Sequence, residues 1–214
     1  SDLQGGRGML LGGVPGVLPA KVVVLGGGVA GTHAAEMAVG ARADVTVFDR
    51  SVKRLAELDT QFAGAVKTAF STPAAVEKAV KEADLVIGAV LIPGAAAPKL
   101  VREETVKKMK KGAVLVDVAI DQGGCFENSK KTSHDDPTFK VHDTLFYCVA
   151  NMPGAVANTS TRALSSATLP YIRAVANDSL DAAIKRFPGL EGGVMTRGGR
   201  LVSEPVRKAF DWED

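Results

Sequence analysis

Apolar positions in the first half of the chain form short unbroken runs, and the segments between the runs have helical spacing. The runs are rich in Val, Ile and Leu and lack polar alternation, which is typical of strands buried on both faces. They predict strands at 21–26, 45–49, 66–70, 84–90 and 113–118. The segments between them predict helices at 29–41, 52–62 and 76–83. This alternation with short links predicts an α/β fold, a Rossmann-type doubly wound parallel sheet.

The alternation of strands and helices stops after Gly123. Residues 139–149 predict two short strands, and residues 159–176 predict a helix interrupted by Pro170. The residues that follow predict a helix at 179–186, a turn-rich hairpin and a final short helix.

This change of pattern divides the chain into two expected parts. Residues 1–158 are expected to form a dinucleotide-binding domain. Residues 159–214 are expected to be a helical and hairpin segment, either a lid on the first domain or one piece of a second domain whose remainder lies outside this chain. A length of 214 residues fits this division, because domains usually hold about 100–200 residues.

Composition narrows the class of partner. The 26 basic and 24 acidic residues are interspersed, so no basic stripe for nucleic acid is present and a small-molecule partner is favoured. The apolar runs are too short to span a membrane, and the opening residues lack the pattern of a signal peptide, so we expect a cytoplasmic protein. The two cysteines are expected to be buried and reduced, and no metal-ligand spacing predicts a metal site.

A glycine-rich stretch, "GGGVAG", ends the first predicted strand and opens the first predicted helix. This context makes the pattern a strong indication of a dinucleotide site. Gly26 permits the tight turn, Gly28 lets the backbone approach a pyrophosphate, and Gly31 lets helix and strand pack closely. The amino end of the helix then offers free N–H groups to the phosphates.

An acidic residue follows at the distance expected for a ribose contact. Asp49 ends the second predicted strand, where its carboxylate can accept a hydrogen bond from the 2′-hydroxyl of the adenosine ribose. The same charge would repel a 2′-phosphate, although Arg50, Lys53 and Arg54 could neutralise one. The balance favours NAD over NADP.

Ligands of an open parallel sheet lie outside the carboxyl ends of its strands. The residues that follow three of the predicted strands offer an apolar wall for a nicotinamide ring, formed by Val90, Leu91, Val118, Val149 and Met152. Asp121 and Asn151 are the polar residues among them. Asp121 precedes a Gly-Gly turn, so its carboxylate either caps the loop or faces the reacting centre. The "SHDDP" segment around His134 indicates a turn rather than a catalytic pair.

Four segments of the chain together resemble the alanine dehydrogenases, relatives of the proton-translocating transhydrogenase subunit. They are "GGRGMLLGGVPGVLPAKVVVLGGGVAG", "ADLVIGAVLIPGAAAPKLV", "VDVAIDQGGCFE" and "YCVANMPGAV". The resemblance runs from about Gly5 to Tyr171 and thins towards the carboxyl end. It implies reversible oxidative deamination of L-alanine to pyruvate and ammonium, with hydride transfer to NAD, by a homo-oligomeric enzyme.

The resemblance also implies roles for individual residues. Asp121 matches the aspartate of the catalytic centre, Asp49 the ribose contact, and Arg54 and Ser71 adenosine contacts. Lys130 stands where the family often has an arginine that contacts the cofactor. The implied cofactor-binding set is Gly26, Gly28, Val29, Gly31, Asp49, Arg54, Ser71, Val90, Leu91, Val118, Ala119, Ile120, Asp121, Lys130, Val149, Ala150, Asn151 and Met152.

Alanine dehydrogenases carry a substrate domain before the glycine-rich stretch, and this chain begins after the corresponding position. We therefore expect the chain alone to bind NAD without turning over alanine. Two other interpretations remain open: an NAD(H)-binding subunit of a transhydrogenase, and an isolated NAD-binding module without catalysis.

Overall fold

The computed structural model describes residues 4–90 and 97–209. The chain divides into two compact units, Ser1–Met152 and Pro153–Asp214. This division falls a few residues before the expected boundary at 158. Leu91, one of the expected cofactor contacts, lies outside the described residues.

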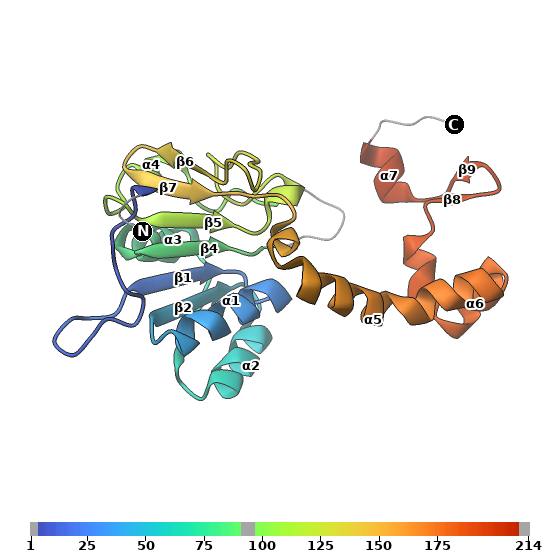
Figure 1. Ribbon diagram of the computed structural model, residues 1–214, viewed down its shortest axis with the longest axis horizontal. Coiled ribbons are helices and arrows are strands. Elements are labelled where there is room, and N and C mark those ends of the chain that lie inside the picture. The colour runs from blue at the N-terminus through green and yellow to red at the C-terminus, as the bar shows by residue number, and fades with distance from the viewer. Residues whose placement is uncertain (1–3, 91–96, 210–214) are drawn as a thin grey trace. The chain divides into compact units, whose positions relative to one another are not determined.

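The first unit is built on one seven-stranded sheet (Figure 1). Its strands are β1 (Lys21–Leu25), β2 (Asp44–Asp49), β3 (Val66–Phe70), β4 (Leu85–Gly88), β5 (Val114–Asp117), β6 (Thr138–Val141) and β7 (Thr144–Tyr147). They lie in the order β3-β2-β1-β4-β5-β7-β6, and all neighbours are parallel except β6, which pairs antiparallel with β7. The expected Rossmann-type sheet is therefore confirmed. The strand order reverses between β1 and β4, which is where such sheets bind ligands.

Helices cover both faces of this sheet (Figure 1). The helices are α1 (Val29–Gly40), α2 (Val52–Phe62), α3 (Pro73–Glu82) and the short α4 (Glu103–Val106). Val22 and Val24 of β1 belong to the core cluster that contains residues of α1 and α2. Val23 and Leu25, which alternate with them, belong to the cluster that contains residues of α3. Burying a Val or Leu side chain fully stabilises the fold by about 1.5–3 kcal/mol. Because both faces of the sheet are buried, apolar residues are favoured from Val22 to Leu25 of β1, and this stretch does not alternate between apolar and polar residues.

The second unit is mainly helical. Its elements are α5 (Ala157–Asn177), α6 (Leu180–Arg186), a 3-10 turn η4 (Pro188–Gly193), the hairpin β8 (Thr196–Arg197) and β9 (Arg200–Leu201), and α7 (Glu204–Ala209). α5 contains Pro170 and continues past it, so the expected interruption is wrong. A proline removes only one intrahelical donor, and a helix of 21 residues keeps its remaining hydrogen bonds. Within the described part of this unit, only Ala174 and Ala183 are buried.

Both cysteines lie in the core of the first unit, as expected. Cys125 and Cys148 are free and buried. Burial raises the pKa of Cys148 to about 11, and the nearby Asp117 charge adds to this effect. The same two causes raise the pKa of Cys125. In residues 4–90 and 97–209, no helix is long and apolar enough to cross a membrane, and no three potential metal-ligating side chains come together.

Candidate cofactor site

The glycine turn connects the end of β1 to the start of α1. Gly26 has a φ of 100°, and a Cβ atom there would lie 2.8 Å from the Ala89 carbonyl oxygen. A Cβ atom at Gly31 would overlap the Gly26 carbonyl oxygen. The backbone conformation and the close packing therefore require glycine at both positions, as the sequence predicted.

Gly28 differs from these two glycines because nothing crowds it. It is the N-cap of α1, with a φ of −67°, and no side chain caps the helix there. A Cβ atom at Gly28 would have no heavy atom within 4 Å. The protein itself thus tolerates a side chain at this point, and the open space lies over the N–H groups of the first helical turn. An anion such as a pyrophosphate fits this position.

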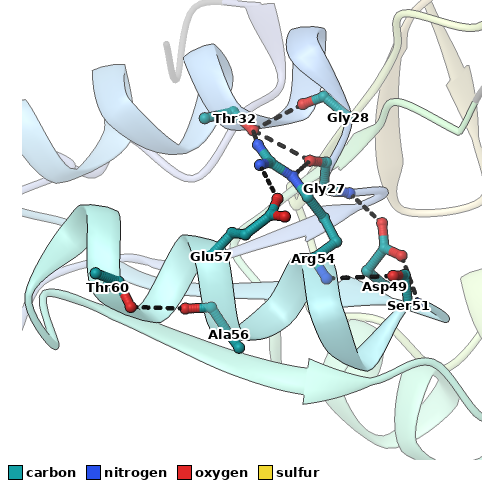
Figure 2. A network of polar contacts seen from close by, with 9 residues as sticks. All are labelled: Gly27, Gly28, Thr32, Asp49, Ser51, Arg54, Ala56, Glu57 and Thr60. Atoms are coloured by element: carbon teal, nitrogen blue, oxygen red, sulfur yellow. Dashed lines mark hydrogen bonds and ion pairs between the residues drawn. The ribbon is translucent and has the colours of Figure 1, made fainter.

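Asp49, the last residue of β2, is hydrogen-bonded to the glycine turn. Its Oδ2 accepts a hydrogen bond from the Gly27 amide at 2.8 Å, and its Oδ1 accepts one from the Ser51 amide at 2.8 Å (Figure 2). Each carboxylate oxygen has a second lone pair that these bonds leave available. Asp49 can therefore support the turn and still accept hydrogen bonds from a ribose.

Arg54 of α2 contacts the same turn through the Gly27 carbonyl (Figure 2). Its Nε donates to the Gly27 carbonyl at 2.6 Å, and one terminal nitrogen donates to Thr32 Oγ1 at 2.8 Å. The other terminal nitrogen donates to Glu57 at 2.8 Å. The guanidinium thus links α2 to the glycine turn and to α1. This bridging role was not predicted from the sequence, which indicated only an adenosine contact.

A cavity of about 730 Å³ lies beside the glycine turn. It is lined by Gly26, Gly28, Val29, Ala30, Phe48, Asp49, Arg50, Ser71, Ala89, Val90, Pro98 and Leu100. Six predicted cofactor residues are among these: Gly26, Gly28, Val29, Asp49, Ser71 and Val90. A second cavity of about 610 Å³ shares Arg50, Ser71 and Leu100 with the first. Arg54 does not line the larger cavity, because its side chain is directed into the turn.

Nine further predicted residues come after β5 or β7 in the sequence and do not line this cavity. They are Val118, Ala119, Ile120, Asp121, Lys130, Val149, Ala150, Asn151 and Met152. Ala119, Ile120 and Val149 are buried. Asn151 has a positive φ of 53°, and its carbonyl lies 3.1 Å from His134 Nε2. The Lys130 ammonium lies 5.0 Å from the centre of the Phe139 ring.

Asp121 lies on a turn after β5, in the 3-10 helix η2 (Ile120–Gln122). Its side chain is 62% exposed, and its Oδ1 lies 3.9 Å from the ammonium of Lys131, whose side chain is 68% exposed. The carboxylate is therefore open to a substrate or to water. Of the two roles left open by the sequence, an exposed reacting group agrees better with this geometry than a loop cap does.

The loop cap is instead Asp117, the last residue of β5, which the sequence analysis missed. Its side chain is fully buried. One carboxylate oxygen accepts from the Ala119 amide at 3.1 Å, and the other accepts from the Cys125 amide at 2.9 Å and from the Ser129 hydroxyl. A carboxylate within an apolar run, one residue before the end of the predicted strand 113–118, was the signal available in the sequence.

The family model described as "Alanine dehydrogenase/PNT, C-terminal domain" matches residues 1–204. The chain belongs to this alanine dehydrogenase/PNT family. It is 58% identical over 207 residues to the alanine dehydrogenase of Mycolicibacterium smegmatis, covering 97% of the chain and 56% of that protein. It is 55% identical over 210 residues to the alanine dehydrogenase of Halomonas elongata, covering 98% of the chain and 57% of that protein. The chain thus spans about half the length of these relatives.

Solved structures of the alanine dehydrogenase/PNT family agree with this assignment. An L-alanine dehydrogenase superposes with a TM-score of 0.91 at 51% identity, covering 98% of the chain and 58% of that structure. A transhydrogenase from Sinorhizobium meliloti superposes with a TM-score of 0.72 at 25% identity, covering 94% and 55%. The family resemblance seen in the sequence is confirmed.

Proposed function

We propose that this chain is the cofactor-binding part, and a carboxyl-terminal piece of the substrate-binding part, of an NAD-dependent L-alanine dehydrogenase. The observation that carries the proposal is the cavity beside the glycine turn, with Asp49 and Gly28 in its wall. Relatives named alanine dehydrogenase are 55–58% identical over nearly the whole chain, which supports L-alanine as the substrate. Homo-oligomeric assembly of the complete protein stays a prediction.

In this proposal the described residues hold the cofactor in three places. The open N–H groups after Gly28 bind the pyrophosphate, Asp49 accepts from the ribose hydroxyls, and Val90 contributes to an apolar wall. When bound, the cofactor would supply the acceptor for a hydride from the α-carbon of alanine. A negative charge at Asp49 disfavours a 2′-phosphate, so NAD is preferred to NADP.

Asp121 is the proposed acid–base residue of this part. Loss of hydride from alanine leaves an imine, which water converts to pyruvate and ammonium. The exposed Asp121 carboxylate would accept a proton from that water or orient it. Groups that bind the substrate carboxylate are proposed to lie in the half of the relatives that this chain does not span.

The second unit is proposed to belong to the substrate domain. Its helix α5 exposes Leu164, Leu169, Ile172 and Val175, with exposed fractions between 46% and 65%. Burying such residues against a partner surface would be favourable, so they fit contacts with the rest of that domain or with another subunit. A cytoplasmic location stays a prediction.

The main alternative is an NAD(H)-binding transhydrogenase subunit, which would pass hydride to a second nucleotide. The superposition with a transhydrogenase supports it, but less closely than that with an L-alanine dehydrogenase, at TM-scores of 0.72 and 0.91. The alanine dehydrogenase is therefore our conclusion.

The test compares this chain alone with this chain fused behind the amino-terminal part of the Mycolicibacterium smegmatis relative. Calorimetric titration should show NAD binding to both proteins. NADH formation from alanine should be seen with the fusion and not with the chain alone. Hydride transfer from NADH to a second nucleotide, without alanine turnover, would favour the transhydrogenase instead.

A further inference from the structure

The segment 97–100, in the wall of the cofactor cavity, lies beside the segment 122–125, which follows Asp121. The Ala97 amide donates to the Gln122 carbonyl at 3.0 Å, and the Leu100 amide donates to the Cys125 carbonyl at 2.8 Å. Pro98 and Leu100 line the cofactor cavity. The wall of the cavity and the turn that carries Asp121 are therefore directly hydrogen-bonded to each other.

Lys99 reinforces this connection with its side chain. Its ammonium donates to the Gly123 carbonyl at 2.6 Å and to the Gly124 carbonyl at 2.8 Å. Gly123 and Gly124 both have positive φ angles, 86° and 73°. This left-handed pair of residues, which glycine adopts without strain, directs two successive carbonyl groups to one cation. Hydrogen bonds from a charged donor are stronger than those between neutral groups.

The same turn is held from its other side by the buried Asp117 carboxylate. Asp117 accepts from the amides of Ala119 and Cys125, which flank Asp121 on both sides in the sequence. The Asp117 carboxylate thus accepts hydrogen bonds from N–H groups of the turn, while the Lys99 ammonium donates hydrogen bonds to its C=O groups. Asp121 lies in a 3-10 turn of three residues, Ile120–Gln122. The groups bound by Asp117 and by Lys99 are therefore only a few residues from Asp121 in the sequence.

We propose that Lys99 is a positioning residue for Asp121. It holds the Gly123–Gly124 backbone, and with it the direction of the Asp121 carboxylate relative to the cofactor cavity. The proposal rests on the proposed function, in which Asp121 acts on the substrate. In this proposal the Lys99 ammonium acts through its bonds to Gly123 and Gly124 and not through contact with a reactant, although the residue also lines the second cavity. Its loss should therefore slow the reaction without weakening NAD binding, because misplacing a reacting group by about 1 Å can cost about 100-fold in rate.

The experiment uses the fusion protein that turns over alanine. Lys99→Met should lower kcat by about 10- to 100-fold while the NAD dissociation constant stays within about twofold. Lys67→Met is the matched control, because Lys67 lies near the amino ends of the strands, where its ammonium pairs with Asp44 at 2.6 Å. The control should keep the wild-type kcat.

Two further measurements separate positioning from a general loss of structure. Lys99→Cys should have the same defect, and aminoethylation of the new thiol should restore most of kcat, since it returns an ammonium group to nearly the same place. Cys125 and Cys148 are buried and should not react. Hydrogen exchange of the Gly123, Gly124 and Cys125 amides should be faster in Lys99→Met than in the wild type and unchanged in Lys67→Met.

The outcomes distinguish the two proposals. If the wild-type fusion turns over alanine and Lys99→Met does so equally well, the positioning role is wrong and the proposed function stands. If no protein turns over alanine, the proposed function fails. The amide exchange then decides about Lys99: unchanged exchange in Lys99→Met overturns its hold on the turn, and faster exchange supports it.

Discussion

Asp49 and Gly27 are joined by a 2.8 Å hydrogen bond from the glycine amide to the carboxylate, so the expected ribose acid also supports the glycine turn. One residue then serves both the shape of the turn and the choice of cofactor. Substitutions at Asp49 should accordingly change both the nucleotide affinity and the free energy of unfolding.

Asp49→Ala should weaken NAD binding and narrow the preference for NAD over NADP. The free energy of unfolding should also fall by about 1–3 kcal/mol, because the Gly27 and Ser51 amides lose their acceptor. Titration calorimetry with both nucleotides and urea unfolding measure the two effects. Equal affinity of the unmodified chain for NAD and NADP would show that Asp49 does not select the cofactor.

Gly28→Val should abolish NAD binding with little loss of stability. The new side chain meets no protein atom near its Cβ position and extends into the space assigned to the pyrophosphate. Gly31→Ala is the informative comparison, since its Cβ would overlap the Gly26 carbonyl oxygen and should destabilise the fold. The measurements are NAD titration and thermal unfolding. Wild-type affinity in Gly28→Val would place the phosphates elsewhere.

Asp121→Asn should leave the fold and the NAD affinity nearly unchanged. Its side chain is 62% exposed, and changes at such positions usually alter stability by less than about 0.5 kcal/mol. In the fusion that turns over alanine, kcat should fall by about 10²–10⁴-fold, the usual contribution of acid–base catalysis. Steady-state kinetics with alanine measure the effect, and a kcat near that of the wild type would remove Asp121 from the mechanism.

The two buried thiols should be unreactive in the folded protein at pH 8. Burial raises the pKa of Cys148 to about 11, so the reactive thiolate is rare at that pH. A thiol reagent should label both cysteines only after unfolding in urea.

The same shift predicts a pH dependence of stability. A raised pKa means that the folded state binds the thiol proton more tightly than the unfolded state. The contribution is therefore complete below the ordinary thiol value of 9.0 and is lost as the pH rises through about 11. Cys148→Ala should show a smaller decrease of the unfolding free energy from pH 8.5 to 10.5 than the wild type. If the unfolding free energies of Cys148→Ala and the wild type depend on pH in the same way, the raised pKa of Cys148 is wrong.

Local patterns were sufficient to predict the parallel strands and the glycine turn. Val22, Val24 and their neighbours are selected by burial on both sheet faces, and this leaves an unbroken apolar run in the sequence. Gly26 and Gly31 are required by backbone geometry and close packing within the same turn. In both cases the sequence pattern that allows the prediction lies within a few consecutive residues.

Contacts between distant segments could not be predicted in the same way. Pro98 and Leu100 line the cavity because their segment is hydrogen-bonded to residues 122–125, and no spacing rule connects these two stretches. Arg54 is expected to contact adenosine, and the sequence did not predict that three of its donors bond to Gly27, Thr32 and Glu57. Asp117 ends β5 and Asp121 follows it, and only the burial of the two side chains tells which one caps the loop.

The link that Arg54 makes between the glycine turn and two helices has a kinetic consequence. Because Asp49 and Arg54 order the turn through hydrogen bonds within the protein, little conformational entropy remains to be lost when a nucleotide binds. Nucleotide association should then be limited by diffusion and by removal of water from the cavity, with no slow ordering step. Stopped-flow traces would follow a single exponential whose rate rises linearly with nucleotide concentration.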